Sequence, residues 1–304
     1  MVVVDNSGCG RARQLVGDRF KFVDWIENGE NVGFGAAINQ AFRAYPTRFL
    51  ATLNDDARAA PDWLERLIQA VEQDPASGMA ASRVGLSGSG GQLDSAGMLI
   101  ALDGSSKQRG HGEPFEAFAE AAEVLLPSGS AALYRKEMLD EIGLFEDDYF
   151  LYCEDTDLGL RGRWAGWKCW YVPEAWVEHT YSKTAGRASP RKAYFVERNR
   201  LRTVIRNFPF SRVLLSFACA LTRYLWHGIS VMKGKGKAAE FTRQGHSPLA
   251  LPLMVARAHW DCITRLPALL RQRRVIMAKR RITARQFNLL LREHRISLKR
   301  IAEL

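Results

Sequence analysis

The sequence has few cysteines, and none of them are spaced as pairs. The five are odd in number, scattered and free of C-x-x-C spacing: Cys9, Cys153, Cys169, Cys219 and Cys262. This distribution argues against a disulfide framework and against a structural zinc site. It favours a reducing compartment, so we expect a cytoplasmic protein.

Several familiar motifs are also missing. No Ser-His-Asp order and no H-E-x-x-H motif is present, which leaves phosphoryl or sugar–phosphate chemistry built on carboxylates and a metal ion. No helix-turn-helix, RRM or zinc-finger pattern is found, so we expect no nucleic-acid partner. The first residues, "MVVVDNSG", are typical of a strand that enters a turn rather than of a signal peptide.

Acidic residues are scarce in the last part of the chain. Residues 185–304 contain 5 Asp and Glu against 26 Lys and Arg, whereas residues 1–184 contain 28 against 17. This asymmetry indicates a boundary and an anionic partner for the basic part. Nucleic acid, acidic lipid headgroups and phosphorylated substrates are the candidates. We place one domain at residues 1–207 and a basic, all-helical region at 208–304.

Apolar runs alternate with helical patterns in the first part, which predicts a layered α/β domain. Strands are expected at 2–4, 20–25 and 48–54, and a strand that passes into a helix is expected at 128–143. A glycine turn leads into a helix from residue 31, and a second helix covers 60–75 with an apolar face. That face consists of Trp63, Leu64, Leu67, Ile68 and Val71. Residues 212–232 are long and apolar, but Arg223 and His227 interrupt them, which favours an interfacial or core helix over a bilayer span.

The stretch "YFLYCEDTDLGLRGRWAGW" at 149–167 places three carboxylates, Glu154, Asp155 and Asp157, at the start of a helix. One interpretation is a capped surface helix, because acidic side chains suit a helix start. Thr156 and Asp157 can then act as caps, and Asp157 can pair with Arg161 four residues later. The alternative is a catalytic carboxylate.

Further polar residues follow predicted strands. "LNDDA" puts Asn54, Asp55 and Asp56 at a strand end, where they can bind Mg²⁺ or Mn²⁺ or simply cap the next helix. His179 ends "VPEAWVEH", and a lone histidine is more often structural unless carboxylates lie nearby. Asp5 can cap a turn or contact a nucleobase, and "NVGFGAAIN" is a glycine turn without P-loop spacing.

These motifs resemble, as an ordered set, family 2 glycosyltransferases, especially the bacterial rhamnosyltransferase and galactofuranosyltransferase-like branch. The set is "VVVDNSG", "NVGFGAAIN", "LNDDA", the segment from "SGSAALYR" to "RGRWAGW", and "VPEAWVEH". The resemblance covers about residues 2–207 and implies a GT-A fold, a nucleotide-sugar donor and inversion at the anomeric carbon. Family members usually begin with a strand before "VVVDNSG", so we expect a GT-A domain that lacks its first strand.

The resemblance also implies roles for individual residues. Asp155 matches the general base, and Glu154 and Asp157 would orient it or bind acceptor hydroxyls. Asn54 replaces the first aspartate of the D-x-D position, so Asp56 is the main metal ligand, and His179 completes the metal site. The donor side comprises Asp5, Asn31, Gly33, Asn54 and Asp55, and the substrate side comprises Gly129, Ser130, Asp157 and Trp167. Tyr149, Phe150, Tyr152 and Trp167 would offer faces for sugar stacking.

The expected partners are a nucleotide-sugar, a glycan or lipid-linked acceptor in cell-surface polysaccharide or glycolipid synthesis, and an anionic membrane surface. That last partner, at the inner face of the membrane, follows from basic charges interleaved with apolar helical faces in residues 185–304. The cofactor is Mn²⁺ or Mg²⁺. Two alternatives remain open, a metal-dependent phosphohydrolase and a catalytically impaired glycosyltransferase-like protein.

Overall fold

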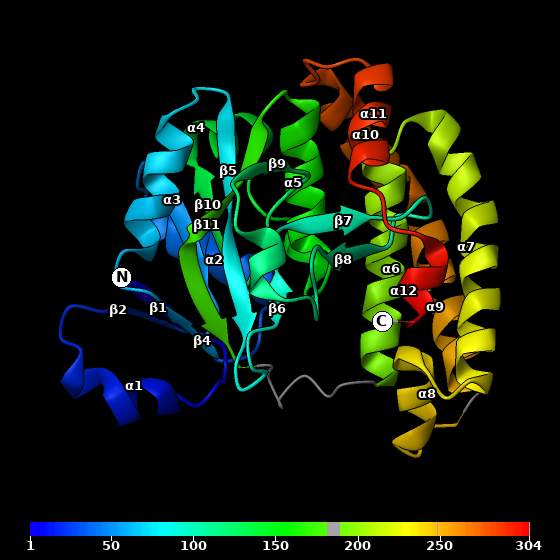
Figure 1. The fold of residues 1–304 in the computed structure, drawn as a ribbon, viewed down its shortest axis with the longest axis horizontal. Helices are drawn as coiled ribbons and strands as arrows, with labels where there is room; N and C mark the ends of the chain where they lie inside the picture. The colour runs from blue at the N-terminus through cyan, green and yellow to red at the C-terminus, as the bar shows by residue number, and fades with distance from the viewer. Residues whose placement is uncertain (181–188, 248, 304) are drawn as a thin grey trace.

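The structure is a computed structural model that describes residues 1–180, 189–247 and 249–303. An α/β domain lies beside a layer of helices (Figure 1). The strands are β1 (Val2–Asp5), β2 (Asp24–Glu27), β3 (Phe49–Leu53), β4 (Ala57–Ala59), β5 (Ser77–Leu86), β6 (Leu93–Ser95), β7 (Met98–Ile100), β8 (Ser106–Gln108), β9 (Ala122–Val124), β10 (Ala131–Arg135) and β11 (Lys168–His179). The helices are α1 (Arg11–Val16), α2 (Phe34–Ala44), α3 (Trp63–Glu72), α4 (Lys136–Ile142), α5 (Glu154–Trp164), α6 (Pro190–Asn207), α7 (Phe210–Met232), α8 (Gly236–Arg243), α9 (Ala250–Thr264), α10 (Leu266–Ala278), α11 (Ala284–Glu293) and α12 (Leu298–Glu303).

The main sheet is mixed and runs in the order β3-β10-β5-β11-β4, with β6 paired to β5 and β9 paired to β11. The long strands β5 and β11 are parallel, whereas β10 is antiparallel to both of its neighbours. The carboxyl end of β3 leads to "NDD", and the carboxyl end of β11 is His179 itself. Two of the polar motifs predicted from the sequence therefore follow strands of one sheet.

Helices cover both faces of this sheet because its strands alternate their side chains between two cores. On one face, Leu67 and Val71 of α3 pack with Leu133 of β10 and Val177 of β11. On the other, side chains of α2, α4 and α5 pack with β5 and β10; this core includes Phe42, Met138, Leu139, Leu158, Met79 and Tyr134. The predicted apolar face of α3 is confirmed except at Leu64, which is exposed.

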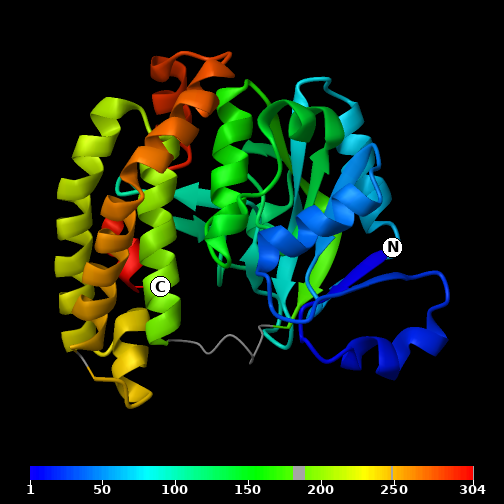
Figure 2. The same ribbon diagram turned by 180° about the vertical axis from the view of Figure 1, so that it is seen from behind.

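The first two strands form their own small parallel sheet, which shares no strand pairing with the main sheet among the described residues. Val2 pairs with Asp24, so β2 begins at Asp24 and the expectation of a strand at 20–25 is wrong for its first four residues. Phe20 and Phe22 instead contact each other edge to face and remain exposed. Figure 2 shows this small sheet and α1 projecting from one side of the domain.

The basic region is helical throughout its described residues, as predicted. Helix α6 lies nearest the sheet and packs against α9 and α10, while α7 packs with α8 and α12 at the far edge of the molecule (Figures 1 and 2). Within the described ranges, none of the helices combines the length and the apolar character needed to cross a bilayer. The predicted boundary after residue 207 remains a prediction, since α6 contacts both parts.

Helix α5 differs from the surface helix that was one interpretation of its sequence. Most of its side chains are buried, including Leu158, Leu160 and Trp164, and none of the described side chains caps its start. The Trp164 ring stacks on Phe287 of α11 with ring centroids 4.0 Å apart, and its indole N–H donates to the Asn207 carbonyl at 2.7 Å. The predicted pair between Asp157 and Arg161 is confirmed at 2.9 Å, but it is a buried pair.

Candidate active site

The turn before α5 has an unusual backbone. Phe150, Tyr152 and Cys153 all have positive φ values, of 63°, 71° and 66°. Bulky L-residues rarely adopt this left-handed region, and such strain persists only where the surroundings enforce it. The turn delivers Glu154 and Asp155 to the first two positions of α5. Strain concentrated directly before two carboxylates marks this turn as a candidate site.

Neighbouring elements hold the strained turn from two sides. The Phe150 carbonyl accepts a hydrogen bond from the Phe34 N–H at 2.8 Å, and Gly33 packs so closely that a Cβ there would lie 2.4 Å from the same oxygen. From α6, the Asn199 amide donates to the carbonyls of Tyr149, Leu151 and Tyr152 at 2.8–2.9 Å. The glycine motif thus supports the turn that carries the carboxylates.

Asp155 is half-buried and bound by backbone donors. The Gly129 N–H donates to Oδ2 at 3.0 Å, and the Thr156 N–H donates to Oδ1 at 2.6 Å. Burial raises the pKa of Asp155, while these hydrogen bonds limit the rise. A carboxylate held by two donors, with part of its surface in solvent, has the properties of a positioned general base.

Glu154 lies beside Asp155 and is more deeply buried. Its side chain is 6% exposed, and its Oε2 has no hydrogen-bond partner among the described residues. Burial and the neighbouring Asp155 charge raise the pKa of Glu154 to about 8. A carboxyl group with a pKa of about 8 is mostly protonated at neutral pH, so Glu154 does not place a second negative charge beside Asp155.

A second cluster lies at the ends of β3 and β11. The Nε2 of His179 is 3.0 Å from Oδ1 of Asp56, and its Nδ1 is 2.8 Å from Oδ2 of Asp94 in β6. Bonds from His111 and His179 hold the pKa of Asp94 low despite its burial, and the bond to Asp94 is the main cause of a raised His179 pKa. Asp94 thereby fixes the ring of His179 with Nε2 directed at Asp56.

Backbone hydrogen bonds connect the two clusters. The Asn54 N–H, just before Asp56, donates to the Ser130 carbonyl at 2.9 Å. The neighbouring Gly129 uses its N–H for Asp155 and its carbonyl for the Thr52 hydroxyl at 2.9 Å. The "SGS" turn therefore bridges the end of β3 to the start of α5, so the structure brings these predicted residues together.

The donor set of the second cluster fits a divalent metal ion. Asp56 offers a carboxylate oxygen and His179 an imidazole nitrogen, and the imidazole is oriented by a buried carboxylate as metal-binding histidines commonly are. Among the residues described, no set of three or more such side chains converges. Two protein ligands suit an ion that takes its remaining ligands from substrate phosphates and water.

The predicted donor-side residues lie at the end of β1, in the turn before α2 and directly after β3. Both carboxylate oxygens of Asp5 accept backbone N–H groups, from Ser7 at 2.8 Å and from Ala12 at 3.4 Å. Asn31 accepts the Gly33 N–H at 2.9 Å, and Asp55 is exposed. Asp5 thus caps a turn, which was one of its two interpretations, and its contact with a nucleobase stays a prediction.

The placement of Asp157 does not support contact with an acceptor. The side chain is completely buried, and its oxygens bind Arg161 at 2.9 Å, the Asn207 amide at 2.8 Å and Arg206 at 3.1 Å. Burial alone would raise the pKa of Asp157, but the two arginines lower it. Tyr149, predicted as a stacking face, is buried on the same carboxylate. Both residues join α5 to α6.

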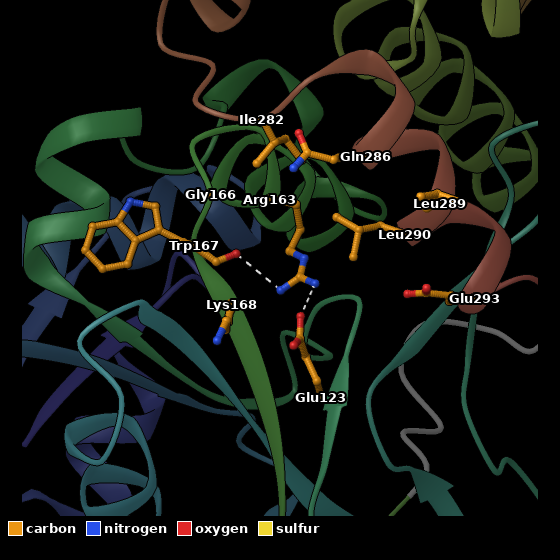
Figure 3. A pocket seen from close by; sticks show the side chains of 10 residues that line it. All are labelled: Glu123, Arg163, Gly166, Trp167, Lys168, Ile282, Gln286, Leu289, Leu290 and Glu293. Carbon is orange, nitrogen blue, oxygen red and sulfur yellow. Dashed lines mark hydrogen bonds and ion pairs between the residues drawn. The ribbon is translucent and has the colours of Figure 1, made fainter.

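Trp167 also lies away from the site. It lies three residues beyond Trp164, the last residue of α5, and Trp164 is nine residues and about 14 Å along the helix axis from Asp155. Figure 3 shows it at the rim of a shallow cavity of about 290 Å³ between β11 and α11, where Arg163 binds Glu123 and the Trp167 carbonyl. This position does not support the expectation that Trp167 stacks on a sugar beside Asp155, which stays a prediction.

The sequence did not reveal Asp94, His111 or Asn199. Asp94 and His111 follow the glycine-rich loop "GLSGSGGQ" without a recognisable motif, and only the pairing of β6 with β5 brings Asp94 to His179. Asn199 stands among arginines in "ERNRLR", within the part of the chain whose sequence was noted only for its basic charge.

Comparison with known proteins agrees with this geometry. Residues 1–205 match the family described as "Glycosyltransferase like family 2". The N-acetylglucosaminyl-diphospho-decaprenol L-rhamnosyltransferases of two Mycobacterium tuberculosis strains, CDC 1551 / Oshkosh and ATCC 25618 / H37Rv, are each 27% identical over 210 residues, covering 62% of this chain and 68% of each relative.

A solved structure of GalNAc-T7 with UDP, GalNAc and Mn²⁺ has a similar fold, with a TM-score of 0.53 and 16% identity. The match covers 67% of this chain and 41% of that one. The predicted family resemblance and the predicted GT-A fold are both confirmed. The chain belongs to glycosyltransferase family 2.

Proposed function

We propose that the protein is an inverting, metal-dependent glycosyltransferase that moves a sugar from a nucleotide-sugar to a hydroxyl group of a lipid-linked acceptor. The observation that carries this proposal is the bridge between the two clusters. One "SGS" turn holds the carboxylate of Asp155 through Gly129 and the end of β3, next to Asp56, through Ser130. A proton acceptor and a diphosphate-binding pair are therefore fixed relative to each other.

In this proposal Asp155 takes the proton of the acceptor hydroxyl. The new bond from that oxygen to the anomeric carbon forms as the bond to the diphosphate breaks, on the opposite face of the sugar. Gly129 and Thr156 keep the carboxylate oriented for this proton transfer, which typically contributes about 10²–10⁴ in rate. Glu154, protonated near neutral pH, adds no second negative charge beside the base.

Asp56 and His179 would hold Mn²⁺ or Mg²⁺, with Asp94 keeping the imidazole in place. Neutralisation of the departing diphosphate is the chemistry that such a bound ion supplies. Asn31, Gly33 and Asp5 lie on turns that would receive the nucleotide. Because a ligating imidazole must be unprotonated, metal loading should compete with protons for His179.

The acceptor follows from the rhamnosyltransferase relatives, whose name describes a sugar carried on a polyprenyl diphosphate. An acceptor of that class lies at a membrane surface, which agrees with the basic charge of residues 185–304; residues 185–188 lie outside those described. We therefore place the enzyme at the cytoplasmic face of the cell membrane, in envelope glycan synthesis.

A transfer assay tests this function. The protein is incubated with Mn²⁺, a panel of nucleotide-sugars and a polyprenyl-diphosphate-linked acceptor sugar, and nucleoside diphosphate release is compared with and without acceptor. Acceptor-dependent release that stops on chelation and gives an inverted linkage is expected. Hydrolysis of simple phosphate esters would favour the phosphohydrolase, and absence of turnover with every donor would favour an impaired family member.

A further inference from the structure

Helix α7 carries its apolar side chains on the outside. Spacings of three, four and seven residues place six of them in one stripe, as expected for one face of an α-helix. The stripe consists of Phe210, Leu214, Phe217, Leu221, Leu225 and Met232, with exposed fractions from 43% to 81%. Monomeric proteins rarely expose a continuous apolar strip of this length, which indicates that something covers it.

The inward face of the same helix is polar. Its buried residues are Ser216, Ala220, Arg223 and Ser230. Arg223 binds Oδ2 of Asp103 at 2.5 Å and Oε2 of Glu197 at 2.6 Å. Rotation of α7 that turned Arg223 outward would take a buried charge partner from both carboxylates, of which Glu197 would keep its ion pair with Arg200. The orientation of the stripe is therefore fixed by the buried ion pairs.

A second stripe lies on α9, in the same helical layer. Leu253, Trp260 and Ile263 are 61–67% exposed, and Leu249, which precedes the helix, is 79% exposed. Tryptophan is the side chain that most favours the boundary between water and lipid. Both α7 and α9 thus present exposed apolar side chains, and neither helix can span a bilayer.

Positive charge accompanies both stripes. Lys233 and Lys235 follow the last turn of α7, and Arg257 lies between Leu253 and Trp260 on α9; all three are exposed. Arg271 and Arg274 of α10 are also exposed. A second copy of this chain would bring the same positive charge against itself, whereas an anionic bilayer is complementary.

We propose that the α7 and α9 stripes lie on an anionic lipid bilayer, with the helices parallel to its plane and the flanking Lys and Arg at the headgroups. This assigns a surface to the membrane location proposed above. Interfacial helices combine these two features, an apolar face in the acyl boundary and basic residues beside it. The proposal concerns binding alone and does not depend on turnover.

Vesicle flotation tests it with the full chain. Vesicles of phosphatidylcholine alone are compared with vesicles that contain about 30% phosphatidylglycerol, which supplies the anionic surface. The stripe variant is Leu214→Gln, Leu221→Gln and Leu225→Gln together. The matched control is Leu15→Gln, Phe22→Gln and Leu64→Gln, three exposed apolar residues of the α/β domain. Circular dichroism and melting verify that both variants fold.

Wild type and control should float with the anionic vesicles and less so at high salt, because screening weakens the attraction. The stripe variant should bind at least about tenfold more weakly, since the free energy of burying even one leucine corresponds to that factor. Equal flotation of the stripe variant, or equal binding to phosphatidylcholine alone, overturns the proposal. Absence of flotation with anionic vesicles also overturns it. If the wild type instead forms a concentration-dependent dimer that the stripe variant abolishes, a second copy of the chain covers the stripe. None of these outcomes requires a donor or acceptor, so they are independent of the transfer assay.

Discussion

The substitution Asp155→Asn removes the proposed base with little change in side-chain shape. Both oxygens of Asp155 accept backbone N–H groups, from Gly129 at 3.0 Å and from Thr156 at 2.6 Å. An asparagine has only one oxygen, so its amide must face one of these two donors. We expect the shorter bond to Thr156 to persist and the bond to Gly129 to be lost.

The size of the effect has two parts. Loss of a general base costs about 10²–10⁴ in rate. Loss of the Gly129 bond, with an N–H left facing another donor, costs about 1–3 kcal/mol in the free energy of unfolding. The stability loss is moderate, so the variant should fold and retain its affinity for a nucleoside diphosphate. The expected result is a kcat reduced by at least about 10², with donor binding within a few fold of wild type.

The assay combines turnover, calorimetric binding of a nucleoside diphosphate with Mn²⁺, and urea unfolding. Asp148→Asn serves as a control, because this exposed carboxylate binds Arg265 at 2.9 Å at the protein surface. Since burial raises the pKa of Asp155, the acidic limb of the wild-type rate profile should lie above the pKa of a free aspartate. Near-complete turnover by the Asp155 variant would show that another group is the base. If the affinity for the nucleoside diphosphate falls by the same factor as turnover, Asp155 instead contributes to donor binding.

Three further predictions follow from the same contacts. Glu154→Gln should remove a pH dependence of the free energy of unfolding. The folded state holds the Glu154 carboxyl protonated up to a pKa of about 8, so the wild type loses stability as the pH rises from about 4.5 through 8. Urea unfolding at several pH values should show that the variant lacks this loss. Asn199→Ala should lower the free energy of unfolding by about 2–4 kcal/mol, because the carbonyls of Leu151 and Tyr152 lose their donor, and it should reduce kcat more than KM; unchanged unfolding would contradict this role. Asp94→Asn should weaken Mn²⁺-dependent nucleotide binding by about 10–100-fold, as loss of a partner to a metal-binding histidine usually does, and unaltered Mn²⁺ titrations would remove Asp94 from the site.

The fold could be predicted largely because its elements carry local signals. The glycine turn before α2, the apolar face of α3 and the passage from β10 to α4 each follow from periodicity and turn residues. The strand expected at 20–25 was misplaced because Phe20 and Phe22 look like strand residues, while pairing with Val2 selects Asp24 as the first residue of β2. The register of a strand depends on how it pairs with its partner, and the composition of a segment does not specify that pairing.

The site was predictable only where a motif coincides with a strand or helix end. Asp56 and His179 contact each other, and the "SGS" turn links the end of β3 to Asp155, while the roles of these residues stay predictions. Asp157 has the same residue type and a similar position but faces Arg161 and Arg206. Two residues, about half a helical turn, separate the half-buried carboxylate of Asp155 from the buried one of Asp157. Packing against α6 and the ion pair with Arg161 distinguish them. Asp94 and Asn199 were not predicted, because each binds a group far away in the sequence: Asp94 binds His179, and Asn199 binds the Tyr152 carbonyl.

Helix α6 connects the proposed chemistry to the proposed membrane surface. Its Asn199 holds the strained turn before Asp155, and two residues earlier its Glu197 binds Arg223 of α7 at 2.6 Å. The family match extends through residue 205 and so includes most of this helix, whereas α7–α12 lie beyond it. Arg223 holds α7 against α6 through Glu197, and Glu197 and Asn199 belong to the same helix. The surface proposed to face the bilayer and the turn that carries Asp155 therefore have a fixed relative orientation. A transferase acting on a lipid-linked acceptor requires such a fixed orientation, since its acceptor hydroxyl stays within reach of the bilayer while the base must meet it from one side.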